Sequence, residues 1–299
     1  MVSQLSHQIR FKNRNMKLLT TIKELTADIS ALKTLGKTIG FVPTMGALHE
    51  GHFSLVRKCK SENDICVVSI FVNPTQFNNP NDLTTYPRTL EQDTKKLAEL
   101  GCDMVFAPST EEMYTNEETT TKFSFDFGGL DQVMEGPNRP GHFNGVVQIV
   151  SKLFDLVQPL RAYFGEKDFQ QVAIIKRMVK VMGYDTMIIP CPIVRETSGL
   201  AMSSRNQLLS PEQKVTAAQI SHILFESRQL IQCQSIPQVQ SWVIEQINRV
   251  DGLQVEYFEI VDRDTLQPAN SWNNTIGCIT VHCGNVRLID NITYQTSKY

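Results

Sequence analysis

The chain has 299 residues, enough for two modest domains or one large one, and its 41% apolar and 20% charged residues are typical of a globular protein. Because 29 Lys and Arg residues nearly balance 31 Asp and Glu residues, the net charge of −2 gives no overall attraction to nucleic acid or to a membrane. No apolar run approaches the ~20 residues of a membrane-spanning helix. Any recognition of phosphate must therefore be local.

The cysteines and the first residues indicate the compartment. The seven cysteines are scattered without a CxxC pair, which favours reduced thiols in the core over a disulfide framework or a zinc site. Residues 1–15 are polar and basic and lack the apolar centre of a signal peptide, so we expect a flexible leader, with the folded part beginning at Met16. These features predict a cytoplasmic protein.

Apolar spacing predicts alternating helices and strands over residues 16–190. Helical spacing occurs at 17–35, 52–62, 88–100, 142–157 and 169–183. Apolar runs typical of buried parallel strands occur at 39–42, 65–72, 103–107, 162–164 and 187–194. Residues 77–87 are rich in turn formers. The alternation predicts an α/β fold, a Rossmann-like doubly wound parallel sheet that binds ligands outside the carboxyl ends of its strands.

Two stretches depart from this alternation. Residues 108–141 hold few apolar runs and many turn formers, and so long a segment is more often functional than structureless. Within it, Arg139 is placed either to close over an anion or simply to face solvent. From 211 to 250 the pattern is helical, and three β-like runs follow from residue 254. We therefore expect a second, smaller α+β domain over residues 191–299.

The stretch from Ile39 to His52 combines a buried strand, a turn with glycines and the start of a helix. Free N–H groups and the positive helix end would meet there to bind phosphate. It is not a P-loop, because His52 and Phe53 stand where that motif needs Lys and Ser or Thr. His49 and His52 are three residues apart, so both rings can donate to one phosphate chain. Two solvated histidines, or an HxxH metal site, are the alternatives.

Three further polar groups lie where predicted strands end or helices begin. Lys167 follows a short strand at a helix start and is placed to meet a phosphate. Ser203, Ser204 and Arg205 can bind phosphoryl oxygens through side chains and backbone, and Gln76 lies just past a strand end. Each signal means little alone, since most turn lysines and loop glutamines are solvated and Ser-Ser-Arg occurs often by chance.

Five blocks occur in the order found in one known family: FVPTMGALHEGH, SIFVNPTQF, RPGHFNGV, YFGEKDFQQ and GLAMSSRN. From about Met16 to near its end, the chain resembles the pantothenate synthetase (pantoate–β-alanine ligase) family. That family belongs to the nucleotidyltransferase group. The group's HIGH-type turn corresponds here to residues 49–52, and its KMSKS-type loop to residues 202–205.

The resemblance implies a cytoplasmic homodimer that uses ATP and Mg²⁺, with the metal held mainly by the phosphates, and that binds no nucleic acid. It implies ligation of (R)-pantoate and β-alanine to pantothenate, a coenzyme A precursor. The pantoate carboxylate would attack the α-phosphorus of ATP and release diphosphate. The β-alanine amine would then attack the pantoyl adenylate and expel AMP. This chemistry needs neutralised charge and aligned reactants more than a covalent nucleophile.

The resemblance also assigns residues, with Gln76 and Gln171 as pantoate ligands and Gln76 also near β-alanine. Its ATP-binding positions are Met45, Gly46, Ala47, Leu48, His49, Glu50, Gly51, His52, Gly165, Glu166, Lys167, Asp168, Val194, Met202, Ser203, Ser204 and Arg205. The resemblance gives His52 the role of proton donor. Reasoning from the residues themselves assigns the catalytic group, His49, His52 and Lys167, to the charge that develops at the α-phosphate, and Ser203, Ser204 and Arg205 to the departing diphosphate. Since an ordinary histidine pKa is ~6.5, His52 would be largely neutral at pH 7, and charge stabilisation is then its larger role.

Two rival functions remain. An adenylyltransferase that leaves AMP on its product would use the same turn, although the two glutamines and the lack of a basic acceptor pocket argue against it. A fragment of an aminoacyl-tRNA synthetase or another RNA-binding module needs a basic surface and stacking aromatics, which near-neutral charge disfavours. The preferred interpretation requires three segments, at residues 45–52, 165–168 and 202–205, to converge on one triphosphate.

Overall fold

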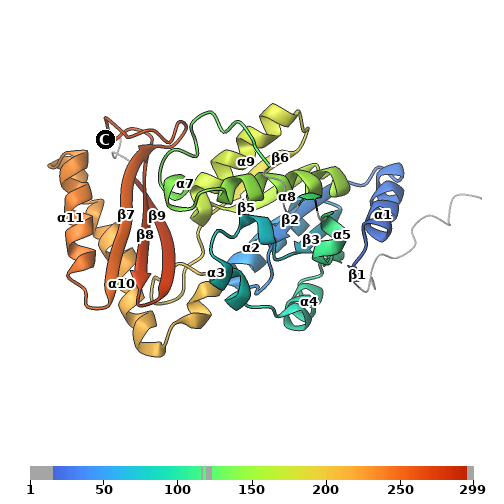
Figure 1. Ribbon diagram of the computed structural model, residues 1–299, viewed down its shortest axis with the longest axis horizontal. Helices are drawn as coiled ribbons and strands as arrows, with labels where there is room; N and C mark the ends of the chain where they lie inside the picture. Colours follow the sequence, from blue (N-terminus) through green and yellow to red (C-terminus); the bar gives the residue numbers. More distant parts are fainter. Residues whose placement is uncertain (1–15, 116, 119–122, 295–299) are drawn as a thin grey trace, which may run out of the picture.

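The computed structural model describes residues 16–115, 117–118 and 123–294, and the predicted leader at 1–15 lies outside them. A parallel sheet of six strands has the order β1-β4-β3-β2-β5-β6 (Figure 1). Its strands are β1 (Lys17–Leu19), β2 (Ile39–Thr44), β3 (Ile65–Ile70), β4 (Met104–Phe106), β5 (Arg161–Gly165) and β6 (Met187–Cys191). The order runs in opposite directions from β2, so the topological switch point lies between β2 and β5.

Helices cover both faces of this sheet. They are α1 (Ile22–Thr34), α2 (Glu50–Glu62), α3 (Pro80–Thr85), α4 (Leu90–Glu99), α5 (Thr110–Met113), α7 (Glu135–Asn138), α8 (His142–Val157) and α9 (Phe169–Met182), with 3-10 turns η1 (Pro74–Gln76) and η2 (Glu166–Asp168). Phe41 of β2 packs in the core formed with α1, α8 and α9, whereas the next residue, Val42, packs in the core formed with α2 and α4. The predicted doubly wound α/β sheet is confirmed.

One local prediction was wrong, and one stretch holds an element that was not predicted. The expected helix at 17–35 begins only at Ile22, because Lys17–Leu19 form β1 and pair in parallel with β4. A strand of three residues is too short for its period of two to be distinguished from helical spacing. The turn-rich stretch at 77–87 contains α3, which Asn79 caps and which carries Pro80 at its first position.

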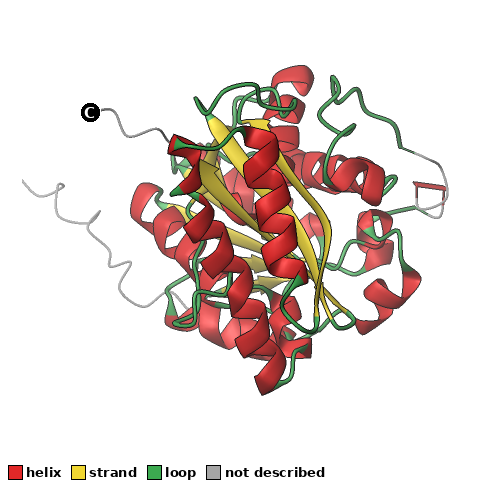
Figure 2. Cartoon of the chain, turned by 90° about the vertical axis from the view of Figure 1, so that its left-hand side faces the viewer, coloured by secondary structure: helices red, strands yellow, loops and turns green. Residues whose placement is uncertain are grey.

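The remaining chain forms a smaller α+β unit, the C-terminal sheet with its helices. Its elements are η3 (Ser204–Leu208), α10 (Pro211–Ser227), η4 (Leu230–Gln232), α11 (Ile236–Asn248), β7 (Leu253–Asp262), β8 (Thr275–Cys283) and β9 (Val286–Tyr294). The three strands are antiparallel in the order β7-β8-β9, and helices lie across one face of them (Figure 2). The predicted smaller α+β part is present, and a domain boundary near residue 190 stays a prediction. None of the helices described is long and apolar enough to cross a membrane.

Candidate active site

A large cavity opens where β2 and β5 end, at the switch point of the sheet. It holds about 1230 Å³ of empty space, its open mouth included, and polar and apolar side chains both line it, as is typical of a small-molecule site. The structure brings all three predicted segments to it. The predicted residues that line it are Met45, His49, Gly51, His52, Gln76, Gly165, Lys167, Asp168, Gln171, Val194, Met202, Ser203, Ser204 and Arg205.

Five predicted ATP-binding residues do not line this cavity: Gly46, Ala47, Leu48, Glu50 and Glu166. Glu50 is exposed and forms an ion pair with Arg57. The Glu166 carboxylate lies 3.7 Å from the Arg263 guanidinium, beside a different cavity. These two carboxylates are therefore directed to other partners.

The N–H groups of the first turn are not free, contrary to our expectation. The Gly46 amide donates to Thr44 Oγ1 at 3.2 Å. The Ala47 and Leu48 amides donate to the two carboxylate oxygens of Asp93, each at 2.9 Å. Because these donors are already bound, this turn presents side chains to the cavity rather than a row of backbone amides.

His49 and His52 hold each other in place at the start of α2. The His49 amide donates to His52 Nδ1 at 3.3 Å, and the Gly51 amide donates to His49 Nδ1 at 3.1 Å. The ring centroids are 4.1 Å apart. Since each Nδ1 accepts a hydrogen bond, these contacts assign the proton of each neutral imidazole to Nε2. Each ring then keeps one N–H donor for a ligand.

Both imidazoles are neutral at pH 7. Burial, followed by the nearby charge of Lys167, lowers the pKa of His49 to about 4. Burial also lowers the pKa of His52 well below its ordinary value, with His49 and Lys167 adding to the effect. Among the residues described, no group of three or more His, Cys, Asp or Glu side chains could hold a metal ion. Two neutral donors beside one lysine suit an anion.

Lys167 lies in η2, between β5 and the start of α9, and its side chain is 18% exposed. Its ammonium group is 3.8 Å from the Asp168 carboxylate. The turn is anchored from β9, where Asn291 Nδ2 donates to the carbonyl oxygens of Glu166 at 2.7 Å and Lys167 at 3.1 Å. The C-terminal sheet therefore helps to place this lysine.

The third segment is tied to the region of α3. Ser204 Oγ and Tyr86 Oη are 3.2 Å apart, and Arg205 donates to Asp82 at 2.9 Å. Ser203 Oγ accepts the Arg205 amide at 3.3 Å. Sequence reasoning missed Asp82 and Tyr86, the second of which also lines the cavity. The only available signal was an aromatic residue inside a polar, turn-rich stretch.

Side-chain amides and a group of apolar side chains also line the cavity. Gln76 Oε1 accepts a hydrogen bond from Asn73 Nδ2 at 3.2 Å, and Asn73 itself accepts from Tyr114 at 2.8 Å. Sequence reasoning also missed Asn73, which is buried directly after β3 and orients Gln76. Gln171 of α9 is a second amide. The apolar wall consists of Phe71, Val146, Ile149, Val150 and Leu153.

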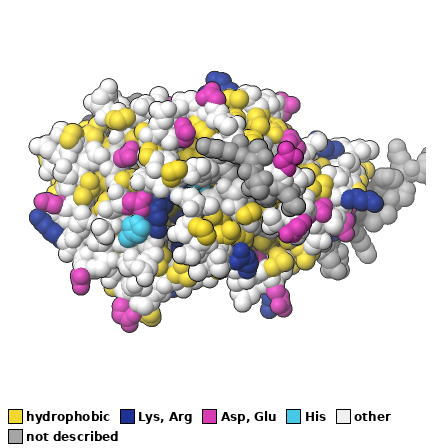
Figure 3. Space-filling model, viewed as in Figure 1, with side chains coloured by type: hydrophobic (Ala, Val, Ile, Leu, Met, Phe, Trp, Pro, Cys, Tyr) yellow, Lys and Arg dark blue, Asp and Glu magenta, His cyan; other side chains and the backbone are white. Residues whose placement is uncertain are grey.

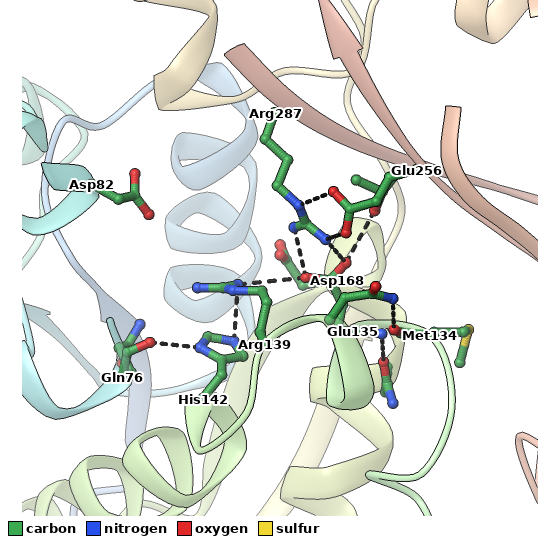
Figure 4. A network of polar contacts seen from close by, with 12 residues as sticks. Gln76, Asp82, Met134, Glu135, Arg139, His142, Asp168, Glu256 and Arg287 are labelled. Atoms are coloured by element: carbon green, nitrogen blue, oxygen red, sulfur yellow. Dashed lines mark hydrogen bonds and ion pairs between the residues drawn. The ribbon is translucent and has the colours of Figure 1, made fainter. Parts of the chain in front are cut away.

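Arg139 does not face solvent, since its side chain is only 17% exposed. It lines a smaller cavity that adjoins the first and shares Lys167 and Arg205 with it. Figure 4 shows its surroundings. Arg139 donates to His142 Nε2 at 3.2 Å, and His142 Nδ1 donates to the Gln76 carbonyl oxygen at 2.8 Å.

A buried carboxylate joins this region to the C-terminal sheet. Glu135 lies 3.5 Å from Arg139 and accepts two hydrogen bonds from Arg287, at 2.8 and 2.9 Å. Tyr257 donates to the same carboxylate at 2.7 Å. Burial alone would raise the pKa of Glu135, but hydrogen bonds and charge from Arg287 bring that pKa down to about 2. Thr280 of β8 also donates to it at 3.0 Å, so Glu135 is ionised and links α7 to all three strands of the C-terminal sheet.

The surface carries charges of both signs. On the face drawn in Figure 3, basic and acidic side chains are interspersed, without a continuous basic patch. This distribution agrees with the near-zero net charge. It gives no support to an RNA-binding role on that face.

Sequence comparisons match nearly the whole chain to proteins of known name. Residues 17–293 match the sequence model described as Pantoate-beta-alanine ligase. The pantothenate synthetase of Bacteroides fragilis strain YCH46 is 56% identical over 285 residues, covering 94% of this chain and 100% of that protein. That of Acetivibrio thermocellus is 46% identical over 283 residues, with 94% and 100% coverage.

Solved structures agree with the sequence comparisons. Pantothenate synthetase from Thermus thermophilus superposes with a TM-score of 0.87 at 41% identity, covering 94% of this chain and 100% of that one. Pantoate-beta-alanine ligase from Francisella tularensis, solved with beta-gamma ATP and beta-alanine, gives a TM-score of 0.81 at 39% identity, with 95% and 99% coverage. The chain therefore belongs to the pantoate–β-alanine ligase family.

Proposed function

We propose that this chain uses ATP to join (R)-pantoate and β-alanine, giving pantothenate, AMP and diphosphate through a pantoyl-adenylate intermediate. One observation carries the proposal. Three segments whose side chains are suited to phosphate, far apart in sequence, line one cavity that also has an apolar wall and two side-chain amides. Membership of the pantoate–β-alanine ligase family supports the same reaction.

In the first step, the pantoate carboxylate attacks the α-phosphorus of ATP and the bond to the β-phosphate oxygen breaks. Negative charge then increases on the phosphate oxygens. Lys167 supplies a positive charge there, and His49 and His52 supply neutral Nε2–H donors. Since both histidines are neutral at pH 7, their proposed role is hydrogen bonding to this charge. The ligation needs no covalent enzyme nucleophile, because attack comes from the substrates.

The loop at residues 202–205 is the proposed site for the departing diphosphate. Ser203 and Ser204 offer hydroxyl groups, and Arg205 offers a guanidinium group at the edge shared by the two cavities. Asp82 holds Arg205 at 2.9 Å. We assign the adenine side to Val194 and Met202, whose backbones are joined by a hydrogen bond of 3.0 Å from the Met202 amide to the Val194 carbonyl.

The apolar part of the cavity suits the uncharged, branched carbon skeleton of pantoate. The apolar wall can cover the methyl groups of pantoate, while Gln76 and Gln171 can bind its hydroxyl groups. In the second step, the β-alanine amine attacks the acyl carbon of pantoyl adenylate and AMP leaves. Gln76, fixed by Asn73, is proposed to contact both substrates.

Mg²⁺ and the assembly state belong to the proposal as well. Mg²⁺ usually binds through one or two carboxylates together with substrate phosphates, and Asp168 provides a carboxylate on the cavity wall. When bound, the ion would neutralise phosphate charge. We further propose that the protein is a homodimer in the cytoplasm, as the family resemblance implies. The cytoplasmic location is also supported by the seven free cysteines, of which six are buried.

Pyrophosphate exchange tests the function directly. Purified protein should exchange labelled pyrophosphate into ATP only when pantoate is present, and should form AMP continuously once β-alanine is added. The exchange isolates the first step, because it needs the adenylate but no amine. Exchange without pantoate would contradict the proposal, as would exchange that requires an amino acid and tRNA. An AMP group retained on the final product would indicate the rival adenylyltransferase.

A further inference from the structure

A buried carboxylate, Asp93 of α4, lies directly behind the histidine turn. The residue is 3% exposed. Its Oδ2 accepts the Ala47 amide and its Oδ1 accepts the Leu48 amide, both at 2.9 Å. Thr89 adds a hydroxyl donor to Oδ2 at 3.1 Å. Asp93 is thus bound by two consecutive backbone amides, 45 and 46 residues before it in the sequence.

The backbone of this turn has the shape of an anion-binding nest. Gly46 has a φ of +82° and Ala47 a φ of +50°, so two consecutive residues are left-handed. Successive N–H groups in such turns point into a concavity that favours negative charge. Alanine adopts this region at a cost, and the turn needs a compensating interaction. The Asp93 carboxylate fills the concavity formed by the Ala47 and Leu48 amides.

The turn leads directly to the proposed catalytic side chains. Leu48, whose amide Asp93 binds, precedes His49, and His49 caps the helix whose first turn contains His52. The position of both Nε2 atoms therefore depends on the path of residues 46–48. A displacement of this backbone would move both donors together and would also break the mutual contacts of the two histidines.

We propose that Asp93 is a positioning residue for the first reaction step. Its carboxylate acts as a built-in anion that fixes the left-handed turn, so that His49 and His52 face the α-phosphate. It does not touch the substrates, and the nest is not a phosphate site. This inference rests on the proposed function, and its test includes a measurement that does not depend on turnover.

Three variants distinguish a role of Asp93 in positioning the histidines from a contribution to the stability of the fold. Asp93→Ala removes the carboxylate, and Asp93→Asn keeps one oxygen acceptor but turns an NH₂ group toward the second amide. Thr89→Val is the matched control, because it removes only the hydroxyl contact of the same carboxylate. Thr89 makes no capping hydrogen bond at the start of α4, so the helix does not depend on it in that way.

We expect pantoate-dependent pyrophosphate exchange to fall about 10- to 100-fold in kcat for both Asp93 variants, with a smaller change in KM for ATP, because misplacement of about 1 Å costs up to about 100-fold. Thr89→Val should stay within about 2-fold of the parent, the change expected when both backbone contacts remain. Formate should restore part of the activity of Asp93→Ala by entering the vacated nest, whereas chloride at equal ionic strength should restore less.

Ring-nitrogen NMR of the histidines provides the second measurement. In the parent protein, His49 and His52 should show neutral Nε2–H tautomers at pH 7, and in Asp93→Asn this pattern should change while the fold is retained by circular dichroism. Unchanged ring signals together with near-parental kcat would overturn the proposal. A parent protein without pantoate-dependent exchange would instead reject the proposed function, and the NMR comparison would still decide whether Asp93 positions the histidines.

Discussion

The two turns that carry the proposed catalytic side chains are held in different ways. The histidine turn after β2 is fixed by Asp93 of α4, so both the turn and its support belong to the parallel sheet and its helices. The lysine turn after β5 is fixed through its carbonyl oxygens by Asn291 of β9, in the C-terminal sheet. The first geometry is therefore local, whereas the second depends on contact between the two sheets.

Asp290, the residue before Asn291, provides a similar support close to the third segment, the loop at residues 202–205. Asp290 is buried and accepts two hydrogen bonds from Arg195, at 2.6 and 2.9 Å. Arg195 directly follows Val194 and pairs with Ala201, next to the loop at 202–205. Two successive residues of β9 thus bind Arg195, which lies beside the loop at 202–205, and the lysine turn. The geometry of the proposed phosphate-binding cluster therefore depends on how β9 sits against η2.

The largest expected loss of activity comes from removing the positive charge of Lys167. Lys167→Ala should lower the rate of adenylation about 100-fold or more, the scale of one preorganised charge-stabilising donor. Single-turnover formation of pantoyl adenylate measures this rate. Because Lys167 also lowers the pKa of His49, NMR titration should show that pKa moving upward. Lys176→Ala is the control, since Lys176 is exposed on α9. A near-parental rate for Lys167→Ala would remove this lysine from the mechanism.

Two substitutions at His52 test which ring nitrogen matters. An asparagine amide can reach the position of Nδ1 and still accept the His49 amide, but it leaves no donor at Nε2. A glutamine amide can reach the position of Nε2 and donate there. We expect His52→Asn to lower the adenylation rate about 100-fold and His52→Gln about 10-fold, because only the second retains a donor. Equal losses in the two variants would argue against a role for the Nε2 donor.

The comparison of the two turns also shows what the sequence could predict. Continuous apolar runs such as 65–70 indicated strands buried on both faces, and the spacing of His49 and His52 indicated that both rings share a helix start. Strand ends and helix starts pointed to His49, His52, Lys167 and the Ser-Ser-Arg loop as candidate phosphate ligands, and the family resemblance supplied the full extent of the three segments. Their convergence was required by the hypothesis, and the structure shows them on one cavity.

The supporting residues could not be predicted, for a physical reason. Asp93 lies on a helix with charged neighbours and resembles a solvated residue, and Asn291 sits in the middle of a strand that pattern alone assigns to a core. Each acts through a backbone group that is more than 40 residues away in the sequence, and local spacing carries no information about such pairs. The prediction of free amides at the first turn was wrong for the same reason, because the Ala47 and Leu48 amides donate hydrogen bonds to Asp93.

The smallest expected effect tests the support of the lysine turn. Asn291→Ala removes both hydrogen bonds to the carbonyl oxygens of residues 166 and 167, while Lys167 itself remains. We expect the adenylation rate to fall about 10-fold, less than for Lys167→Ala, because the charge is retained but misplaced. Asn285→Ala, at an exposed position of the turn before β9, is the matched control. Added to Lys167→Ala, the Asn291 substitution should cost little more, because it acts through the lysine that is already absent. Additive losses in the double variant would show that Asn291 acts through another group, and the contrast between the two turns would then have to be abandoned.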